Sequence, residues 1–283
     1  MKFSLILCTV NREKELIYFL DSLIEQLYKN FEVIVVDQNN NDRVKQIIDR
    51  YAMLDLIYLK SALGLSRARN TGLKVVTGDI VCFPDDDCIY PRILLENINR
   101  FFEQNNYDIL MGKTVDMNTG KIVAGSRAFH NQELSTFYTL GSSTTLFIRN
   151  SMKIHFDERF GLGGIFGSEE ENELVFRLLK KGYRGYYNPN INYVFHPPSD
   201  LNFKDIERVK VRSIGLGAFI AKHLISIEGF FYFVKYNIFR TISGSFLSFI
   251  KFDFIKSKYY FFKWIGIWKG FLLYFRNKDE AII

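Results

Sequence analysis

The sequence predicts an α/β protein with a doubly wound, mostly parallel sheet flanked by helices, followed by a helical C-terminal region. Three observations predict it. In the first 200 residues short apolar runs alternate with amphipathic stretches, which is typical of parallel strands joined by helices. The runs are almost continuously apolar, as expected for strands buried on both faces. From residue 201 onward the chain holds 21 of its 46 aromatic residues, interleaved with lysines. We therefore divide the chain into residues 1–200 and 201–283.

The first strands and helices can be assigned in order from their patterns. FSLILCTV (3–10) is an expected buried strand, and the following stretch 13–28 places leucines on one helical face. The β-branched run FEVIVVD (31–37) is a second strand, followed by a helix at 43–51. Further elements are expected as strands at 55–59 and 79–83 and a helix between them at 66–76.

The later elements follow the same reasoning. A helix is expected at 91–102, with Pro91 near its start, where proline is tolerated. Strands are expected at 107–115 and 143–149. The segment EENELVFRLLKKG predicts a helix with acidic residues in its first turn and Gly182 at its end. Tyr193 to Phe195 then form a short expected strand that leads to His196.

Composition and charge bound the class of protein. The 283 residues are 48% hydrophobic and 24% charged, which is ordinary for a globular chain. The formal net charge is +6, but residues 201–283 alone hold 14 Lys and Arg against 6 Asp and Glu. The three cysteines form no CxxC pair, and Cys8 and Cys82 lie in apolar runs, so we expect buried thiols in a reducing compartment. Neither a cleavable leader nor an apolar stretch long enough to span a membrane is expected.

Polar residues follow three of the expected strands, at the ends where α/β sheets bind ligands. The first strand ends at Thr9, Asn11 and Arg12, the second at Asp37, and the fourth at Asp85, Asp86 and Asp87. No GxGxxG follows the first strand and no GxxxxGK[ST] is present, which argues against a dinucleotide site or a P-loop.

The three consecutive aspartates need a positive charge nearby, because adjacent carboxylates oppose one another's ionisation. A divalent cation such as Mg²⁺ or Mn²⁺ is commonly held by one or two carboxylates together with substrate phosphates. An acidic loop that caps the next helix or lies in solvent explains the same residues equally well. A second acidic group at 169–173 favours a metal-assisted group transfer, in which another carboxylate takes a proton. Acidic residues in a first helical turn also need no catalytic role.

The chain resembles the family-2 glycosyltransferases of the GT-A fold. The segments LILCTVNRE, FEVIVVDQNNND, GLSRARNTGL, FPDDDCIYP and GSEEENELVFRLLKKGY occur in the order typical of that family, over residues 3 to about 200. FDERFGLGGIFGSEEENEL and GLGAFIAKH are similar to bacterial members that build cell-surface polysaccharides.

The resemblance implies roles for individual residues. Thr9 and Asp37 would contact the nucleotide base and ribose, with Asn11 and Arg12 near them. Arg67 or Arg69 would lie near the nucleotide or its phosphates. Asp85 and Asp87 would be the outer residues of the DxD motif, with Asp86 beside the nucleotide sugar and Asp87 the best candidate metal ligand. Glu171 stands where the family has its general base, Glu170 matches the preceding Glu, and Arg177 matches the arginine later in that helix. His196 is a further candidate metal ligand, although a lone histidine is more often structural.

Three positions depart from the family pattern. Gln38 replaces the second acid that usually follows the second strand, which removes one nucleotide contact. Ala62 stands where the family often has Asn before GxSxARN. Glu171 replaces the usual Asp and is longer by one methylene, which bears on the identity of the base because positioned reactions tolerate little displacement.

The implied activity is transfer of a sugar from a nucleoside-diphosphate sugar, with UDP favoured, to a glycan or lipid-linked acceptor. The metal would stabilise charge on the departing diphosphate, and attack from the opposite face would invert the anomeric carbon. A nucleotidyltransferase would use similar chemistry, but the chain lacks a glycine-rich basic triphosphate loop. The rival from another class is a non-catalytic scaffold that binds nucleotide sugars in a polysaccharide assembly complex.

The basic, aromatic segments after residue 200 favour contact with an anionic membrane surface, lying on it without crossing it. This would place the enzyme at the cytoplasmic face of the cell membrane, where a lipid-linked acceptor is met. The same residues fit a helical subdomain that packs on the catalytic part or on a second copy of the chain, so a homo-oligomer stays open. We expect no nucleic acid partner, because the aromatics are too dense for a stacking groove.

Overall fold

The computed structural model describes residues 1–124, 130–137, 142–197 and 205–277. They form two compact units: a first unit of Met1–Phe156 and Leu174–Ser199, and a second unit of Asp157–Glu173 and Asp200–Ile283. The second unit thus includes 157–173, a segment that the division by sequence places in residues 1–200. The boundary between residues 200 and 201 lies outside the described residues.

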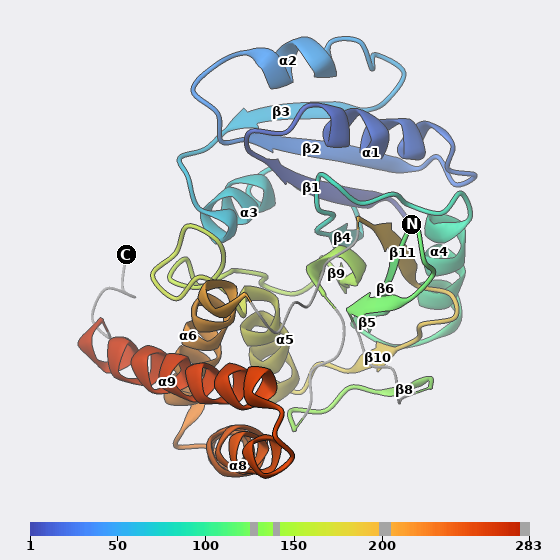
Figure 1. Ribbon diagram of the computed structural model, residues 1–283. Coiled ribbons are helices and arrows are strands. Elements are labelled where there is room, and N and C mark those ends of the chain that lie inside the picture. The colour runs from blue at the N-terminus through green and yellow to red at the C-terminus, as the bar shows by residue number, and fades with distance from the viewer. Residues whose placement is uncertain (125–129, 138–141, 198–204, 278–283) are drawn as a thin grey trace. The chain divides into compact units, whose positions relative to one another are not determined.

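The first unit is built on an eight-stranded sheet with the order β3-β2-β1-β4-β9-β5-β10-β8 (Figure 1). The first four of these strands run parallel, as predicted. β9 pairs antiparallel with both β4 and β5, and β8 pairs antiparallel with β10. The strands are β1 (Phe3–Thr9), β2 (Phe31–Asp37), β3 (Leu56–Lys60), β4 (Ile80–Cys82), β5 (Ile109–Met111), β8 (Gln132–Glu133), β9 (Phe147–Arg149) and β10 (Gly185–Tyr187).

The single strand expected at 107–115 is wrong, because the chain divides there between two sheets. β5 ends at Met111, and β6 (Lys113–Asp116) belongs to a three-stranded sheet with β7 (Ile122–Ala124) and β11 (Tyr193–His196). Gly112 joins the two strands at a point of close backbone approach, where a Cβ would lie 1.8 Å from the carbonyl oxygen of Asn192. The expected strand at 143–149 is also shorter, because it begins with the 3-10 turn η1 (Ser143–Thr145).

Helices cover both faces of the large sheet, which explains why its central strands are apolar over most of their length. One face packs against α1 (Lys14–Ile24), α2 (Arg43–Ile48) and α4 (Leu94–Gln104). The other packs against α3 (Leu65–Leu73) and the part of α5 (Glu170–Lys180) that begins at Leu174. Along β1, Leu5 and Leu7 join the first cluster and Ile6 joins the second. α1 ends at Ile24, before the expected residue 28, and the side-chain amide of Gln26 beyond it donates to the carbonyls of Tyr90 and Pro91.

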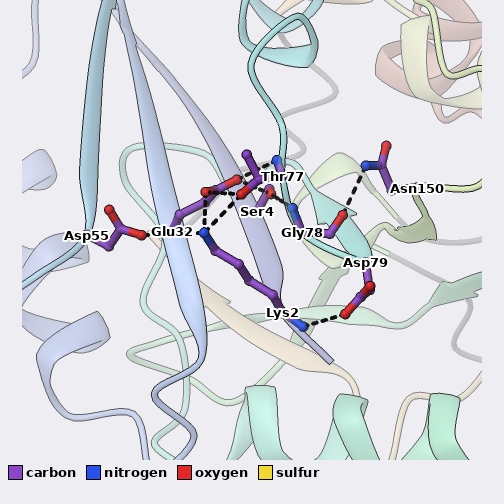
Figure 2. Close-up of polar contacts among 8 residues, drawn as sticks. All are labelled: Lys2, Ser4, Glu32, Asp55, Thr77, Gly78, Asp79 and Asn150. Carbon is purple, nitrogen blue, oxygen red and sulfur yellow. Dashed lines mark hydrogen bonds and ion pairs between the residues drawn. The ribbon is translucent and has the colours of Figure 1, made fainter.

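A polar network fixes the amino ends of the central strands (Figure 2). Glu32 of β2 is buried, and its carboxylate accepts from Nζ of Lys2 at 2.6 Å, from the hydroxyl of Ser4, and from both the backbone N–H and the hydroxyl of Thr77. The hydroxyl of Ser4 in turn accepts from the backbone N–H of Gly78 at 2.8 Å. The network therefore joins β1, β2 and the chain that enters β4.

The second unit is helical, as the sequence predicts. Its helices are α6 (Ile206–His223), α7 (Ile227–Val234), the π-helix η2 (Lys235–Ile242), α8 (Ser243–Ile250) and α9 (Phe254–Arg276). α6 and α9 lie against each other (Figure 1) through small residues. A Cβ on Gly217 of α6 would lie 1.9 Å from the carbonyl oxygen of Ile267, and one on Gly270 of α9 would lie 1.9 Å from that of Ile214. The two backbones thus approach as closely as glycine allows.

Large apolar side chains are exposed on several helices of this unit. Phe239 and Ile242 on η2, Phe246 on α8 and Phe275 on α9 are among them, and Phe252 between α8 and α9 is 80% exposed. Within the described residues, no helix combines the length and the hydropathy needed to cross a bilayer.

Candidate functional site

The three consecutive aspartates lie between the carboxyl end of β1 and the strand β11. A parallel bridge pairs Asp85 with Cys8 of β1, and an antiparallel bridge pairs Ile89 with Phe195 of β11. The segment that carries the aspartates is therefore held on both sides by backbone hydrogen bonds. It lies at the edge where α/β sheets bind ligands, beyond the carboxyl ends of the strands, which we call the strand-end rule.

One cation of the protein, Arg12, serves two of these carboxylates. Asp86 is buried and accepts from the hydroxyl of Thr9 at 2.7 Å and from Nη1 of Arg12 at 2.8 Å. Nη1 of Arg12 also forms an ion pair with Oδ2 of Asp87. Thr9 and Arg12, predicted to contact the nucleotide, are thus engaged with the aspartates in this structure.

Asp85 faces a different cation, the buried guanidinium of Arg69 on α3. Nη2 of Arg69 lies 3.7 Å from Oδ1 of Asp85. The guanidinium carbon lies 5.7 Å from the ring centroid of Phe83 and 5.3 Å from that of Phe156, so two aromatic faces position the cation. Of the two arginines proposed from the sequence, Arg69 is therefore held at the aspartates, whereas Arg67 is exposed on the same helix.

Asp85, Asp87 and His196 form a group that fits a divalent cation. Each offers one ligand atom, and these atoms lie within 4.8 Å of one another. Oδ1 of Asp87 is buried and accepts no hydrogen bond from the described residues, although Nε2 of His196 lies 3.3 Å away. Nδ1 of His196 donates to the carbonyl of Pro197 at 2.7 Å, an arrangement typical of metal-binding histidines because it leaves Nε2 available as a ligand.

The pKa values of the outer aspartates differ in direction. Burial raises the pKa of Asp85 to about 6, and the charge of Arg69 only partly opposes that rise. Burial also acts on Asp87, but there the contacts with His196 and Arg12 outweigh it and the pKa is lowered. Asp87 is therefore the stronger anion of the pair.

Asp37 at the end of β2 forms a second polar group. Its fully buried carboxylate accepts from Nζ of Lys60 at 2.7 Å, from the hydroxyl of Tyr58 at 2.8 Å, and from the backbone N–H and side-chain amide of Asn39. Burial raises the pKa of Asp37, but the bonds from Lys60 and its neighbours outweigh it and hold the pKa below its ordinary value.

The residues beside Asp37 hold the neighbouring loops. Asn11 has a left-handed backbone (φ 56°) and donates its N–H to the side-chain oxygen of Asn39 at 2.8 Å. Gln38, the departure from the family pattern, accepts from the backbone N–H of Gly64 at 2.8 Å, immediately before α3. Gln38 thus connects the end of β2 to the helix that carries Arg69.

The second acidic group lies in the first turn of α5. Glu170 is buried and Glu171 is partly exposed, and both belong to the second unit. Glu169, just before the helix, has a left-handed backbone (φ 69°), which is strained for a residue other than glycine. Glu173 is fully buried and pairs with Nζ of Lys222 at 2.7 Å. Arg177, further along α5, already belongs to the first unit and donates to the carbonyl of His155 in that same unit at 2.6 Å.

Sequence reasoning missed Lys60 and Tyr58, the partners of Asp37. Lys60 pairs with Asp37 in the parallel register of β2 and β3. The strand-end rule, applied to the third strand as it was to the other three, points to Lys60. The sequence held no comparable signal for the two rings around Arg69, because Phe156 is distant from α3 along the chain.

Comparisons with known proteins agree with this fold. Residues 4–161 match the model of the family described as glycosyl transferase family 2. Glycosyltransferase GlyA of Streptococcus pneumoniae is 28% identical over 197 residues, which cover 67% of this chain and 28% of GlyA. TarS of Staphylococcus aureus, a poly(ribitol-phosphate) beta-N-acetylglucosaminyltransferase, is 31% identical over 196 residues, which cover 67% of this chain and 33% of TarS. The chain thus spans a third or less of the length of these two relatives.

Solved structures confirm the predicted GT-A fold. The crystal structure of S. aureus TarS 1-349 superposes with a TM-score of 0.65 at 21% identity, covering 100% of this chain and 83% of that one. The same fragment in complex with UDP-GlcNAc gives 0.62 at 21% identity, covering 100% and 84%. The mannosyltransferase PcManGT of Pyrobaculum calidifontis, in complex with GDP-Man and Mn²⁺, gives 0.62 at 14% identity, covering 96% and 87%.

Proposed function

The chain belongs to glycosyl transferase family 2, and from that premise we propose that it is an inverting glycosyltransferase. It moves a sugar from a nucleoside-diphosphate sugar to a glycan acceptor during the synthesis of a surface polysaccharide. The observation that carries this proposal is the group of Asp85, Asp87 and His196 at the carboxyl end of the parallel strands, which fits a metal-bound diphosphate.

The donor is a nucleotide sugar, with UDP as the favoured nucleotide. The TarS complex with UDP-GlcNAc and the PcManGT complex with GDP-Man support a nucleotide-sugar donor. In this chain the buried carboxylate of Asp37 and the side chains of Thr9, Asn11 and Arg12 would bind the base and ribose. Arg69, whose guanidinium lies beside Asp85, would bind the negatively charged phosphates of the nucleotide.

Asp85, Asp87 and His196 would hold a divalent cation, Mg²⁺ or Mn²⁺. When bound, it supplies Lewis-acid stabilisation of the charge that develops on the nucleoside diphosphate. The two carboxylates suit either metal, and the imidazole is a ligand found more often with transition metals, which favours Mn²⁺. Arg12 orients Asp87 through its ion pair.

Glu171 would act as the general base, with Glu170 beside it. Its carboxylate takes the proton of the acceptor hydroxyl as that oxygen attacks the anomeric carbon from the face opposite the diphosphate. The new glycosidic bond forms as the bond to the diphosphate breaks, so the configuration inverts. General-base catalysis of this kind contributes on the order of 10²–10⁴-fold. Glu171→Gln should therefore lower kcat by about that factor and leave donor binding intact, with the exposed Glu207→Gln as the control.

The acceptor would be lipid-linked and met at the cytoplasmic face of the membrane. Residues 1–200 would form the catalytic part and residues 201–283 the membrane-associated part. The exposed aromatic side chains of the second unit and its basic composition support this assignment.

Donor binding with and without metal tests the proposal directly. UDP, GDP and dTDP are each titrated with Mn²⁺ or with EDTA while the thermal midpoint of unfolding is followed. We expect one nucleotide to raise the midpoint only with Mn²⁺, and to lose that effect in Asp87→Asn. The control Asp49→Asn, at an exposed position directly after α2, should behave as wild type. Stabilisation without sugar transfer would support the scaffold, and no stabilisation by any nucleotide would refute the donor site.

A further inference from the structure

The second unit contains a cavity of about 460 Å³ between η2, α8 and α9. Phe246 and Phe249 of α8 and Phe261 and Trp264 of α9 line it, together with small hydroxyl residues. The three phenylalanines are 50–64% exposed, so they are also part of the apolar surface of the unit. Its size lies within the range of ligand pockets, roughly 300–1,000 Å³.

The polar atoms of the lining leave little for a polar ligand to bind. The hydroxyl of Thr241 donates to the carbonyls of Tyr236 and Asn237, and that of Ser245 donates to the carbonyl of Ser257. The indole Nε1 of Trp264 is buried, so it too is closed to a ligand. A hydrocarbon chain therefore suits this lining better than water or a sugar.

The helices that line the cavity are rich in basic residues. Residues 235–276 hold eight Lys and Arg and one acid, Asp253, which pairs with Lys256 at 2.8 Å. Arg240 precedes the lining residue Thr241, and Lys263 precedes Trp264. Burial lowers the pKa of Lys263. The carboxylate of Glu169 opposes this shift, and the nearby charge of Arg240 adds to it. Two copies of this surface would bring like charges together, whereas an anionic surface would relieve their repulsion.

We propose that this cavity binds one acyl chain of an anionic phospholipid of the membrane surface, with the anionic head group at Arg240 and Lys263. This rests on the membrane location in the proposed function and adds a specific lipid site to it. Adsorption alone needs only the exposed side chains and leaves the cavity empty, so the two cases differ in what Trp264 contacts.

The chain offers a direct probe, because its two tryptophans, Trp264 and Trp268, both lie in α9. In a Trp268→Phe background, Trp264 is the sole fluorophore. The protein is mixed with phosphatidylcholine vesicles that contain phosphatidylglycerol, and either lipid carries bromine at mid-chain to quench tryptophan on contact. We expect stronger loss of Trp264 emission when phosphatidylglycerol carries the bromine, at equal mole fraction of the brominated lipid.

Two variants separate the site from general adsorption. Ser245→Leu fills the cavity and should abolish quenching of Trp264 while the protein still sediments with vesicles. Arg240 is exposed, so Arg240→Gln leaves the packing intact. It should weaken vesicle binding about fivefold at low salt and remove the preference for brominated phosphatidylglycerol. The matched control Lys269→Gln, an exposed cation on α9 five positions beyond the last lining residue, should weaken binding but keep the preference.

Equal quenching by the two brominated lipids would overturn the proposal, as would undiminished quenching in Ser245→Leu. A dimer in sedimentation equilibrium with no vesicle binding would show that a second copy covers this surface. The assay contains no nucleotide sugar, so its failure leaves the glycosyltransferase proposal standing. Asp87→Asn should lose metal-dependent nucleotide binding and keep the quenching, which distinguishes the two proposals from the other side.

Discussion

The buried carboxylate of Glu32 should make the first unit sensitive to acid. Its four donors are the ammonium of Lys2, the hydroxyl of Ser4, and the N–H and hydroxyl of Thr77 (Figure 2). Burial alone raises the pKa of Glu32, but these bonds outweigh it and lower the pKa from 4.5 to about 2. The folded protein thus holds this group ionised where the unfolded chain protonates it.

The size of the effect follows from the two pKa values. A fall from 4.5 to about 2 corresponds to about 3 kcal/mol of stability. Because the folded-state pKa is lowered, this contribution is complete above pH 4.5 and is lost as the pH falls toward 2. By pH 3 about 2 kcal/mol of it is gone. Glu32→Gln removes the charge at every pH, so the variant should lose about 3 kcal/mol at pH 7 and be less sensitive to acid.

Urea unfolding of wild type and Glu32→Gln between pH 7 and pH 3 measures this. Far-ultraviolet circular dichroism reports on both units, whereas tryptophan fluorescence reports on the second unit, because both tryptophans lie in α9. We expect the difference between the two proteins in the dichroism transition to shrink by about 2 kcal/mol across this pH range. The fluorescence transition should be unchanged.

A constant difference between wild type and Glu32→Gln from pH 7 to pH 3 would refute the reasoning, because the ionised carboxylate would then contribute nothing. Glu133→Gln is the matched control. Glu133 is an exposed carboxylate of the same unit that pairs with Arg184, and its substitution should leave the unfolding midpoint unchanged.

Two further substitutions test features of each unit. Glu173→Gln leaves the ammonium of Lys222 without one of its buried partners and should lower the free energy of unfolding by about 3–5 kcal/mol. The tryptophan fluorescence transition should then occur at a lower urea concentration. Glu207→Gln, on the exposed face of α6, should have no such effect. Gly112→Ala places a Cβ 1.8 Å from the carbonyl oxygen of Asn192. It should separate β5 from β6 and lower the dichroism midpoint, and an unchanged midpoint would show that the backbone there adjusts freely.

The central strands could be predicted because their apolar pattern alone determines them. β2 has the predicted bounds, Phe31–Asp37, and β1 ends one residue early. The short strands β7, β8 and β10 were not foreseen, because two or three residues carry no periodicity and their pairing depends on distant segments. The division at Gly112 was missed for the same reason, since it depends on the backbone of Asn192.

The residues of the candidate site could be placed near one another by the strand-end rule, but their partners could not. Thr9 ends one strand that the sequence predicts and Asp85 follows another, so their proximity followed from the parallel order. The role of Arg12 as a partner of the aspartates is a property of the folded loop. His196 lies beside Asp87 because β11 pairs with the segment that follows the aspartates. No local sequence pattern predicts this pairing.

The close packing of α6 and α9 has a consequence for how the second unit could be altered. The two helices meet through Gly217 and Gly270, so the faces that join them contain little of the aromatic content of the unit. Side chains such as Phe246 and Phe275 can therefore be exchanged for polar ones without removing the contacts that hold the helix pair together. The residues that join the two helices are different from those that form the apolar surface, which makes a readily soluble form of the protein a practical engineering target.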